Sequence, residues 1–204
     1  MNYLKGSICV FGDSITWGWG ATEPRTEGWT NKLLSDVHKP LSEENRVYSL
    51  GIPGETTSGL LKRIENESYA RSPNTIIIAS GLNDCRSTKL TNVKVVELEE
   101  FKKNIFEIIQ IAKKFTNKIV FVGLTRVNEN LTIPLIWNND EMFRNEDVKQ
   151  YNDELKKICS KEKIKFINVI DLLSNEDLDA TDGIHPNFKG HEKIFKYIKQ
   201  ELEV

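Results

Sequence analysis

The sequence predicts an α/β fold in which helices cover both faces of a parallel sheet. Two observations support this fold class: the chain contains five short apolar runs, and the stretches between them carry apolar residues three and four positions apart. Runs in which successive residues are apolar are typical of strands buried on both faces. Strands that alternate with helices form parallel sheets with crossover connections. Because no repeat, low-complexity tract or linker interrupts the 204 residues, we expect a single domain over residues 1–204.

The five strands are expected at residues 7–11, 46–50, 75–80, 119–124 and 166–169, where Ile, Val and Phe are concentrated. The five helices are expected at residues 29–39, 57–69, 93–115, 146–161 and 187–202. In each of them apolar residues recur on one face, as shown in chain order by Trp29 and Leu33, Leu60 and Ile64, Phe101 and Ile105, Tyr151 and Leu155, and Phe195 and Ile198.

The segment 125–143 does not fit this alternation. It is too long for a routine connection between a strand and a helix, and long insertions are often functional. It carries six side chains that are too apolar for a solvated loop: Ile133, Pro134, Ile136, Trp137, Met142 and Phe143.

Composition excludes several classes of protein. The net charge of −2 comes from interspersed acidic and basic residues without a basic stripe, which argues against nucleic acid as a partner. No apolar run reaches the length of a membrane span, and none at the start is typical of a secretory leader. The three cysteines, Cys9, Cys85 and Cys159, form no CxxC pair, so neither a disulfide framework nor a structural zinc site is expected. These observations favour a reducing compartment, the cytoplasm.

Polar and glycine-rich motifs follow the expected strands. Gly12-Asp13-Ser14 follows the first, 51–57 with Gly54 follows the second, and Asn83-Asp84 follows the third. Asp182 and His185 come some way after the fifth. Because ligands of open parallel sheets bind outside the carboxyl ends of the strands, we expect these residues to gather at one edge of the fold.

The residue types suit acyl transfer. A serine nucleophile needs an adjacent base, and histidine titrates near neutral pH, so His185 can activate Ser14. Asp182 lies three residues before His185, so a tight turn can bring its carboxylate to the imidazole. The backbone N–H groups of Ser14 and Gly54 and the side-chain amide of Asn83 are candidate donors to a developing oxyanion.

Other interpretations stay open at this point. Taken singly, each of these residues is a common turn former or helix cap. Asp13, Asn83, Asp84, Asp182 and His185 can in principle hold a divalent metal for phosphoester hydrolysis, although borderline metals favour several histidines and only one follows a strand. The other histidines, His38 and His191, fall near a helix end and within a helix. A binding module for carbohydrate or lipid without catalytic activity is the third interpretation.

Four motifs together resemble one family. "FGDSIT", "GIPGETT", "GLND" and "DGIHPN" occur in this order, and as a set they resemble the SGNH hydrolases, also called GDSL-type esterases and lipases. The resemblance implies one SGNH hydrolase domain with a flavodoxin-like three-layer α/β/α fold and a five-stranded parallel sheet in the order 2-1-3-4-5. Ile15 and Ser49 stand where many members have leucine and asparagine. The chain between residues 123 and 152 looks like the bacterial, cytosolic-looking members.

The resemblance also implies roles and an activity. Ser14 would be the nucleophile, His185 the base and Asp182 its orienting acid, with Ser14, Gly54 and Asn83 as oxyanion donors and with no cofactor or metal. The implied activity is hydrolysis of small or short-chain acyl esters through an acyl-enzyme. Acetylated sugars, thioesters and lysophospholipids remain as alternative substrates. We expect Asp13, Trp17, Trp19 and Trp137 at the substrate pocket, and the apolar insertion is equally compatible with a contact between copies of a homo-oligomer.

Overall fold

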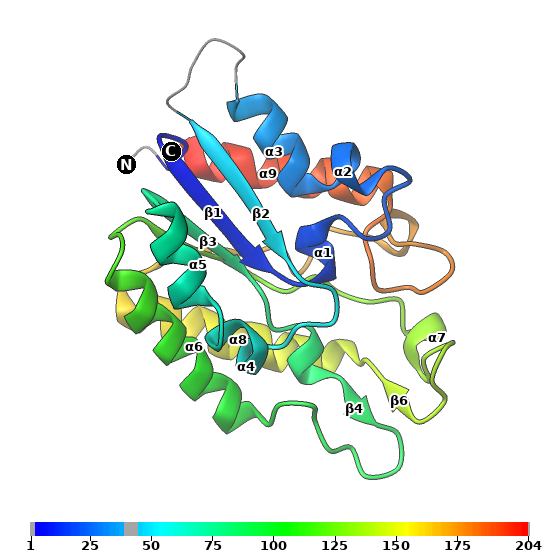
Figure 1. Cartoon of the computed structure of the whole chain (residues 1–204). Helices are drawn as coiled ribbons and strands as arrows, with labels where there is room; N and C mark the ends of the chain where they lie inside the picture. Colours follow the sequence, from blue (N-terminus) through cyan, green and yellow to red (C-terminus); the bar gives the residue numbers. More distant parts are fainter. Residues whose placement is uncertain (1–2, 39–44, 204) are drawn as a thin grey trace.

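The structure is a computed structural model that describes residues 3–38 and 45–203 (Figure 1). Within these residues, five parallel strands form one sheet in the order β2-β1-β3-β5-β7. They are β1 (Ser7–Gly12), β2 (Arg46–Gly51), β3 (Thr75–Ala79), β5 (Ile119–Val122) and β7 (Lys165–Ile167). When only these five strands are numbered along the chain, the order is 2-1-3-4-5, so the predicted sheet and strand order are confirmed.

Strand β1 shows why these runs form a central sheet. Ile8, Cys9, Val10 and Phe11 are all fully buried. Ile8 and Val10 belong to the hydrophobic cluster on one face of the sheet, and Cys9 and Phe11 belong to the cluster on the other face. Because side chains alternate along a strand, only a run without polar residues can fill both cores.

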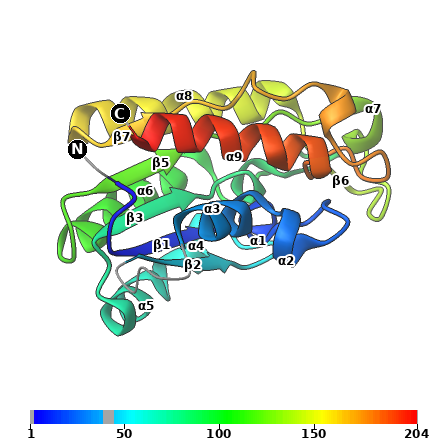
Figure 2. The ribbon, with the colours of Figure 1, turned by 90° about the horizontal axis from the view of Figure 1, so that it is seen from above.

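Helices cover both faces of the sheet and give the predicted three layers (Figures 1 and 2). One face carries α3 (Trp29–Val37) and α9 (Phe188–Glu203), which contact each other. The opposite face carries four helices: α4 (Thr57–Leu61), α5 (Ile64–Arg71), α6 (Leu98–Lys113) and α8 (Asn145–Glu162). No helix within the described residues is long and apolar enough to cross a membrane.

Some predicted helix bounds were wrong. The helix expected at 57–69 is divided into α4 and α5 around Lys62 and Arg63, where the Arg63 guanidinium turns in and donates to the carbonyl of Leu50 at 2.7 Å. The helix expected at 93–115 begins only at Leu98, because the chain before it pairs with the segment after β3, as in the Val95 N–H···O=C Arg86 bond of 2.9 Å. Helix α3 ends at Val37, and Lys39, the last residue expected in it, lies outside the described residues.

Several short elements were not predicted. They are α1 (Ser14–Trp17), α2 (Pro24–Glu27), α7 (Glu129–Thr132), the 3₁₀ helices η1 (Asn83–Cys85) and η2 (Asn175–Asp177), and a two-stranded antiparallel sheet of β4 (Ser87–Thr88) and β6 (Glu141–Met142). The sheet and α7 lie beyond the carboxyl ends of the parallel strands (Figure 1). The apolar residues of the segment 125–143 fall into two groups. Leu135, Met142 and Phe143 are buried, whereas Ile136 and Trp137 are exposed.

Candidate active site

Ser14 lies at the point where β1 passes into α1. The Asp13 carboxylate caps this helix by accepting a hydrogen bond of 3.0 Å from the Ile15 N–H. The turn requires glycine at position 12, because a Cβ there would lie 2.1 Å from Thr16 Oγ1 and 2.3 Å from the Ala79 carbonyl oxygen. The Gly-Asp-Ser motif therefore holds the Ser14 hydroxyl at the carboxyl edge of the sheet.

His185 reaches Ser14 from a loop 171 positions later in the chain. Its Nε2 lies 2.7 Å from Ser14 Oγ, and its Nδ1 lies 2.6 Å from Asp182 Oδ2. The other oxygen, Asp182 Oδ1, accepts hydrogen bonds from the backbone N–H groups of Ile184 at 2.7 Å and His185 at 3.0 Å. This turn fixes both the carboxylate and the imidazole in one local unit.

The surroundings of Asp182 favour its ionised form. Burial alone would raise its pKa, but the hydrogen bond from His185, the positive charge of that ring when it is protonated, and the two backbone N–H donors outweigh burial and lower the pKa of Asp182. An ionised carboxylate only accepts hydrogen bonds, so His185 Nδ1 is the donor of this contact. His185 Nε2 then faces the Ser14 hydroxyl as an acceptor, which is the arrangement that a general base requires.

Ser14, Gly54 and Asn83 line the same cleft of about 300 Å³ together with His185. Asn83 donates one amide hydrogen to the Glu55 carbonyl at 3.0 Å, and its second amide hydrogen has no acceptor in residues 3–38 and 45–203, so it can bind a ligand. Within the described part of the chain, the backbone N–H groups of Ser14 and Gly54 donate to no protein acceptor. Gly54 adopts a φ of 78°, which a residue with a side chain rarely takes.

Two charged side chains, Asp84 and Arg63, hold the loop of residues 55–57 in place, and sequence analysis did not assign them this role. Asp84 accepts hydrogen bonds from both the backbone N–H and the hydroxyl of Thr57, and burial raises its pKa to about 6. Arg63 binds the Glu55 carboxylate, with 2.7 Å between Nε and Oε1. Both contacts fix residues 55–57 beside Asn83, although the sequence offers only the nearness of Asp84 to the "GLND" motif as a signal.

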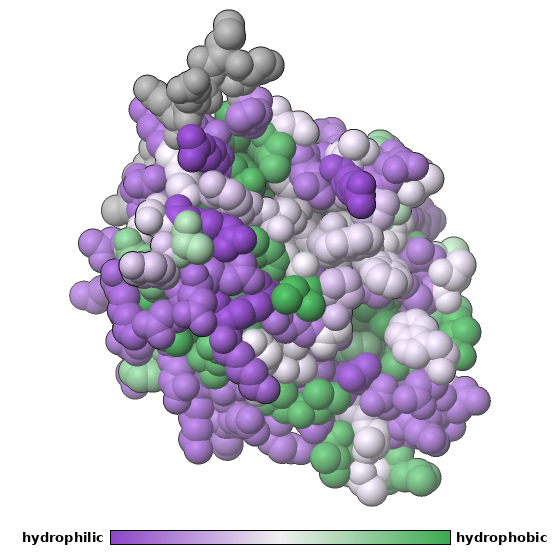
Figure 3. Space-filling model, in the orientation of Figure 1, coloured by the Kyte–Doolittle hydropathy of each residue, from purple (hydrophilic) through white to green (hydrophobic). Residues whose placement is uncertain are grey.

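Aromatic and apolar side chains form the walls of the cleft. Asp13, Trp19 and Trp137, which we expect at the substrate pocket, line this cleft, and so do five residues that were not predicted: Pro53, Leu82, Arg86, Phe143 and Ile184. Trp17 does not line it but packs on Trp19, with 5.8 Å between ring centroids. Figure 3 shows this face, where pale and green side chains gather near the strand ends and around α7, while its left side is largely purple.

Trp19 is held beside His185 by the fully buried His191. The His191 imidazole donates a hydrogen bond of 2.9 Å from Nε2 to the Trp19 carbonyl. Its Nδ1 accepts a hydrogen bond of 3.3 Å from the backbone N–H of Trp29. Burial lowers the pKa of His191 to about 4, so this ring stays neutral and keeps both contacts. The Trp19 ring lies 5.7 Å from the His185 ring between centroids, and it covers one side of the imidazole.

The carboxylates considered as metal ligands have separate partners. Asp13 caps α1, Asp84 binds Thr57, and Asp182 binds His185. Within residues 3–38 and 45–203, no three His, Cys, Asp or Glu side chains come together in a group that could hold a metal ion. Cys9, Cys85 and Cys159 are buried free thiols.

The sequence model of the GDSL-like lipase/acylhydrolase family matches residues 10–193. The chain belongs to this family. The match spans the elements that carry Ser14, Gly54, Asn83, Asp182 and His185, and it bears out the resemblance drawn from the four motifs.

Two curated relatives of this GDSL-like chain are esterases. An isoamyl acetate-hydrolyzing esterase of Saccharomyces cerevisiae is 26% identical, with 98% of this chain and 87% of the relative covered. An acetylxylan esterase of Geobacillus stearothermophilus is 27% identical, with 96% and 93% covered. Together with membership of the family, these relatives identify the chain as an ester-hydrolysing enzyme.

Solved structures support the fold. A lipase/acylhydrolase from Enterococcus faecalis has a TM-score of 0.77 at 22% identity and covers 97% of this chain and 95% of its own. The acetylxylan esterase of Geobacillus stearothermophilus has a TM-score of 0.78 at 20% identity, with 100% and 97% covered.

Proposed function

We propose that this enzyme is a serine carboxylesterase that hydrolyses short-chain acyl esters through Ser14, His185 and Asp182. We also propose that residues 1–204 form one domain. The observation that supports it best is the continuous pair of contacts from Ser14 Oγ to His185 Nε2 at 2.7 Å and from His185 Nδ1 to Asp182 Oδ2 at 2.6 Å. A nucleophile, its base and the group that orients the base are thereby joined in the order that acyl transfer needs.

The proposed reaction has two steps. Ser14 Oγ attacks the ester carbonyl carbon while His185 Nε2 takes its proton, and the imidazolium then protonates the leaving alcohol oxygen as the C–O bond breaks. Water next attacks the acyl carbon while His185 Nε2 takes its proton, and the imidazolium then returns a proton to Ser14 Oγ as the bond between Oγ and the acyl carbon breaks, which releases the acid. Asp182 stays ionised and stabilises the imidazolium in both steps, and a positioned base of this kind contributes roughly 10²–10⁴-fold to the rate.

The donors around the cleft support stabilisation of the tetrahedral intermediate. The backbone N–H groups of Ser14 and Gly54 and the second amide hydrogen of Asn83 would bind the oxyanion. Because Asp84 and Arg63 fix the loop that carries Gly54, these donors are in place before the substrate binds. Preorganised donors cost no rearrangement during the reaction, and one such donor is worth on the order of 10²–10³ in kcat.

The cleft favours a small substrate. Its volume of about 300 Å³ lies at the lower end of the range for small-molecule sites. The names of both curated relatives refer to acetyl esters, one of a small alcohol and one of a polysaccharide. We therefore infer acetyl and other short acyl esters as substrates. Deacetylation of a sugar is the second candidate, since Trp19 and Trp137 give the cleft aromatic walls.

A fluorophosphonate probe and one substitution test the proposed function. The probe should label Ser14 in the parent enzyme and should fail to label Ser14→Ala. We expect Ser14→Ala to lose hydrolysis of p-nitrophenyl acetate, whereas Ser35→Ala, which changes an exposed serine on α3, should keep the parent rate. Hydrolysis by Ser14→Ala at the parent rate would exclude Ser14 as the nucleophile, and loss of activity on treatment with a chelator would favour the metal-dependent interpretation.

A further inference from the structure

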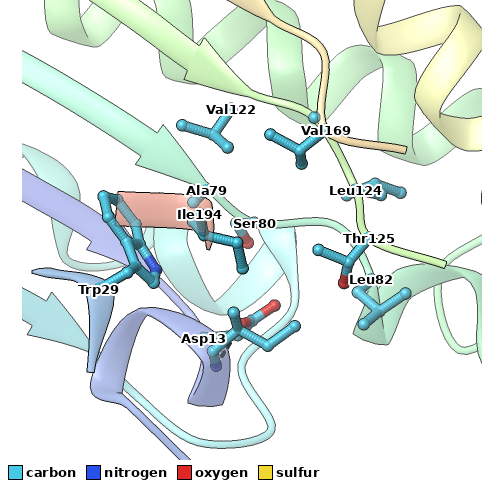
Figure 4. A pocket seen from close by; sticks show the side chains of 12 residues that line it. Asp13, Trp29, Ala79, Ser80, Leu82, Val122, Leu124, Thr125, Val169 and Ile194 are labelled. Atoms are coloured by element: carbon cyan, nitrogen blue, oxygen red, sulfur yellow. Dashed lines mark hydrogen bonds between the residues drawn. The ribbon is translucent and has the colours of Figure 1, made fainter. Parts of the chain in front are cut away.

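A second, smaller cavity lies behind the nucleophile, within the core. It has a volume of about 30 Å³ and lies at the carboxyl ends of β3, β5 and β7, between the sheet and the buried side chains of Trp29 and Ile194 (Figure 4). Three polar side chains line this otherwise apolar space: Asp13, Ser80 and Thr125. All three are at least 96% buried.

The two hydroxyl groups have no hydrogen-bond partner among the residues that the structure describes. Within the described residues, neither Ser80 Oγ nor Thr125 Oγ1 makes a hydrogen bond, although both atoms are inaccessible from outside. Buried polar groups in folded proteins nearly always have a partner, and ordered water often supplies it. A water molecule needs a cavity of roughly 10–15 Å³ and two to four polar partners, so this cavity has room for about two.

Asp13 supplies the third partner. Its Oδ1 accepts the Ile15 N–H, whereas its Oδ2 accepts no hydrogen bond from any residue that the structure describes. Figure 4 shows the Asp13 carboxylate and the Thr125 hydroxyl turned toward the space between the strand ends. Burial raises the pKa of Asp13 to about 6 because the carboxylate is desolvated. An internal water would donate the hydrogen bond that this oxygen lacks.

We propose that this cavity binds internal water held by Asp13, Ser80 and Thr125, and that Ser80 and Thr125 are positioning residues for the nucleophile. The water links Asp13, which caps α1 and precedes Ser14, to the ends of β3 and β5. It therefore fixes the start of α1 relative to the sheet, and with it the direction of the Ser14 hydroxyl. The kinetic part of this inference rests on the proposed function, whereas the water site itself does not.

Two hydroxyl deletions, singly and combined, test the site through thermal stability. If water binds there, Ser80→Ala and Thr125→Val each remove one of its partners, and each should lower Tm by about 2–4 °C. The double variant should lose less than the sum, because both hydroxyls bind water in the same small cavity. In a dry cavity each substitution would instead remove an unpaired buried hydroxyl, so an unchanged or higher Tm would overturn the proposal.

Kinetics test the positioning role. We expect Ser80→Ala and Thr125→Val to lower kcat for p-nitrophenyl acetate by about tenfold with KM nearly unchanged, as for an interaction made only in the transition state. Thr125→Ser keeps the hydroxyl and should keep kcat. The matched control is Ser68→Ala, because Ser68 Oγ is also buried and makes no hydrogen bond to a described residue, but it does not line this cavity. A parent-like kcat in Thr125→Val, or an equal loss in the control, would exclude the positioning role.

A high-resolution crystal structure of the parent enzyme tests the water directly. We expect electron density for water within hydrogen-bond distance of Asp13, Ser80 and Thr125, and a space without density would refute the site. Fluorophosphonate labelling of Ser14 in the parent separates the two proposals, because its failure would refute the nucleophile and leave the water site standing.

Discussion

Asp182→Asn should inactivate the enzyme by reversing the hydrogen-bond direction across His185. Asp182 Oδ1 accepts two backbone N–H groups, from Ile184 at 2.7 Å and from His185 at 3.0 Å. An asparagine must keep its oxygen at this position, because its NH₂ group would face two donors there. The NH₂ group therefore lies against His185 Nδ1, where the carboxylate oxygen now lies at 2.6 Å.

The magnitude follows from the tautomer that this arrangement imposes. An NH₂ donor makes Nδ1 the acceptor, so the imidazole proton moves to Nε2, which then faces Ser14 Oγ as a donor and cannot accept its proton. The corresponding aspartate-to-asparagine change in a serine protease lowers kcat by about 10⁴-fold. We expect a similar loss here, equivalent to roughly 5 kcal/mol of transition-state stabilisation.

Steady-state hydrolysis of p-nitrophenyl acetate measures this loss, and thermal unfolding checks that the variant is folded. Asp179→Asn is the matched control, since Asp179 lies in the same loop and its side chain binds Thr181 rather than His185. We expect the control to keep the parent kcat. A kcat of Asp182→Asn within tenfold of the parent would refute the role assigned to Asp182.

Three further predictions concern the rest of the site. Asn83→Ala should lower kcat by about 10²–10³-fold without abolishing activity, because one of three proposed oxyanion donors is lost; a parent-like kcat would remove Asn83 from the oxyanion hole. Burial raises the pKa of Asp84 to about 6 in the folded protein, above its value of about 3.9 in the unfolded chain. Between about pH 4 and about pH 6 the folded state therefore binds more protons than the unfolded state, and the free energy of unfolding falls as the pH rises through this range. Asp84→Asn should therefore show a smaller fall in the free energy of unfolding between about pH 4 and about pH 7, and urea denaturation that gives the parent's fall would contradict this. Trp137→Ala should shift the preference among acyl chain lengths, because the indole lines the cleft; an unchanged profile over a series of p-nitrophenyl esters would place it outside the substrate site.

The sheet and the residues at its edge were predictable because they depend on local sequence. The apolar run before Gly12 marks a buried strand, and parallel strands bring their carboxyl ends to one edge, so the approach of His185 to Ser14 follows from topology. The turn from Asp182 to His185 is equally local, since three residues separate the carboxylate from the imidazole.

The rest of the site depends on contacts between distant segments. At the break between α4 and α5, Arg63 turns in toward the Leu50 carbonyl, a contact that the spacing of apolar residues does not indicate. Arg86 and Phe143 reach the cleft through the pairing of β4 with β6, whose two-residue strands are too short to leave a pattern. His191 has the spacing of an ordinary core residue, and its role is visible only once Trp19 lies against it.

The β4–β6 sheet also bears on how this enzyme can diversify. It brings Arg86, directly before β4, and Phe143, directly after β6, to the cleft, and an ion pair of 3.3 Å joins Arg86 to Glu141 of β6, but none of the reacting groups lies on this sheet. Mutations there can reshape the substrate site while the nucleophile and its base keep their geometry. Selection, in nature or in directed evolution, can thus change what the enzyme accepts without rebuilding how it reacts, and a library at Arg86 and Phe143, which flank the two strands and line the cleft, is the economical place to begin.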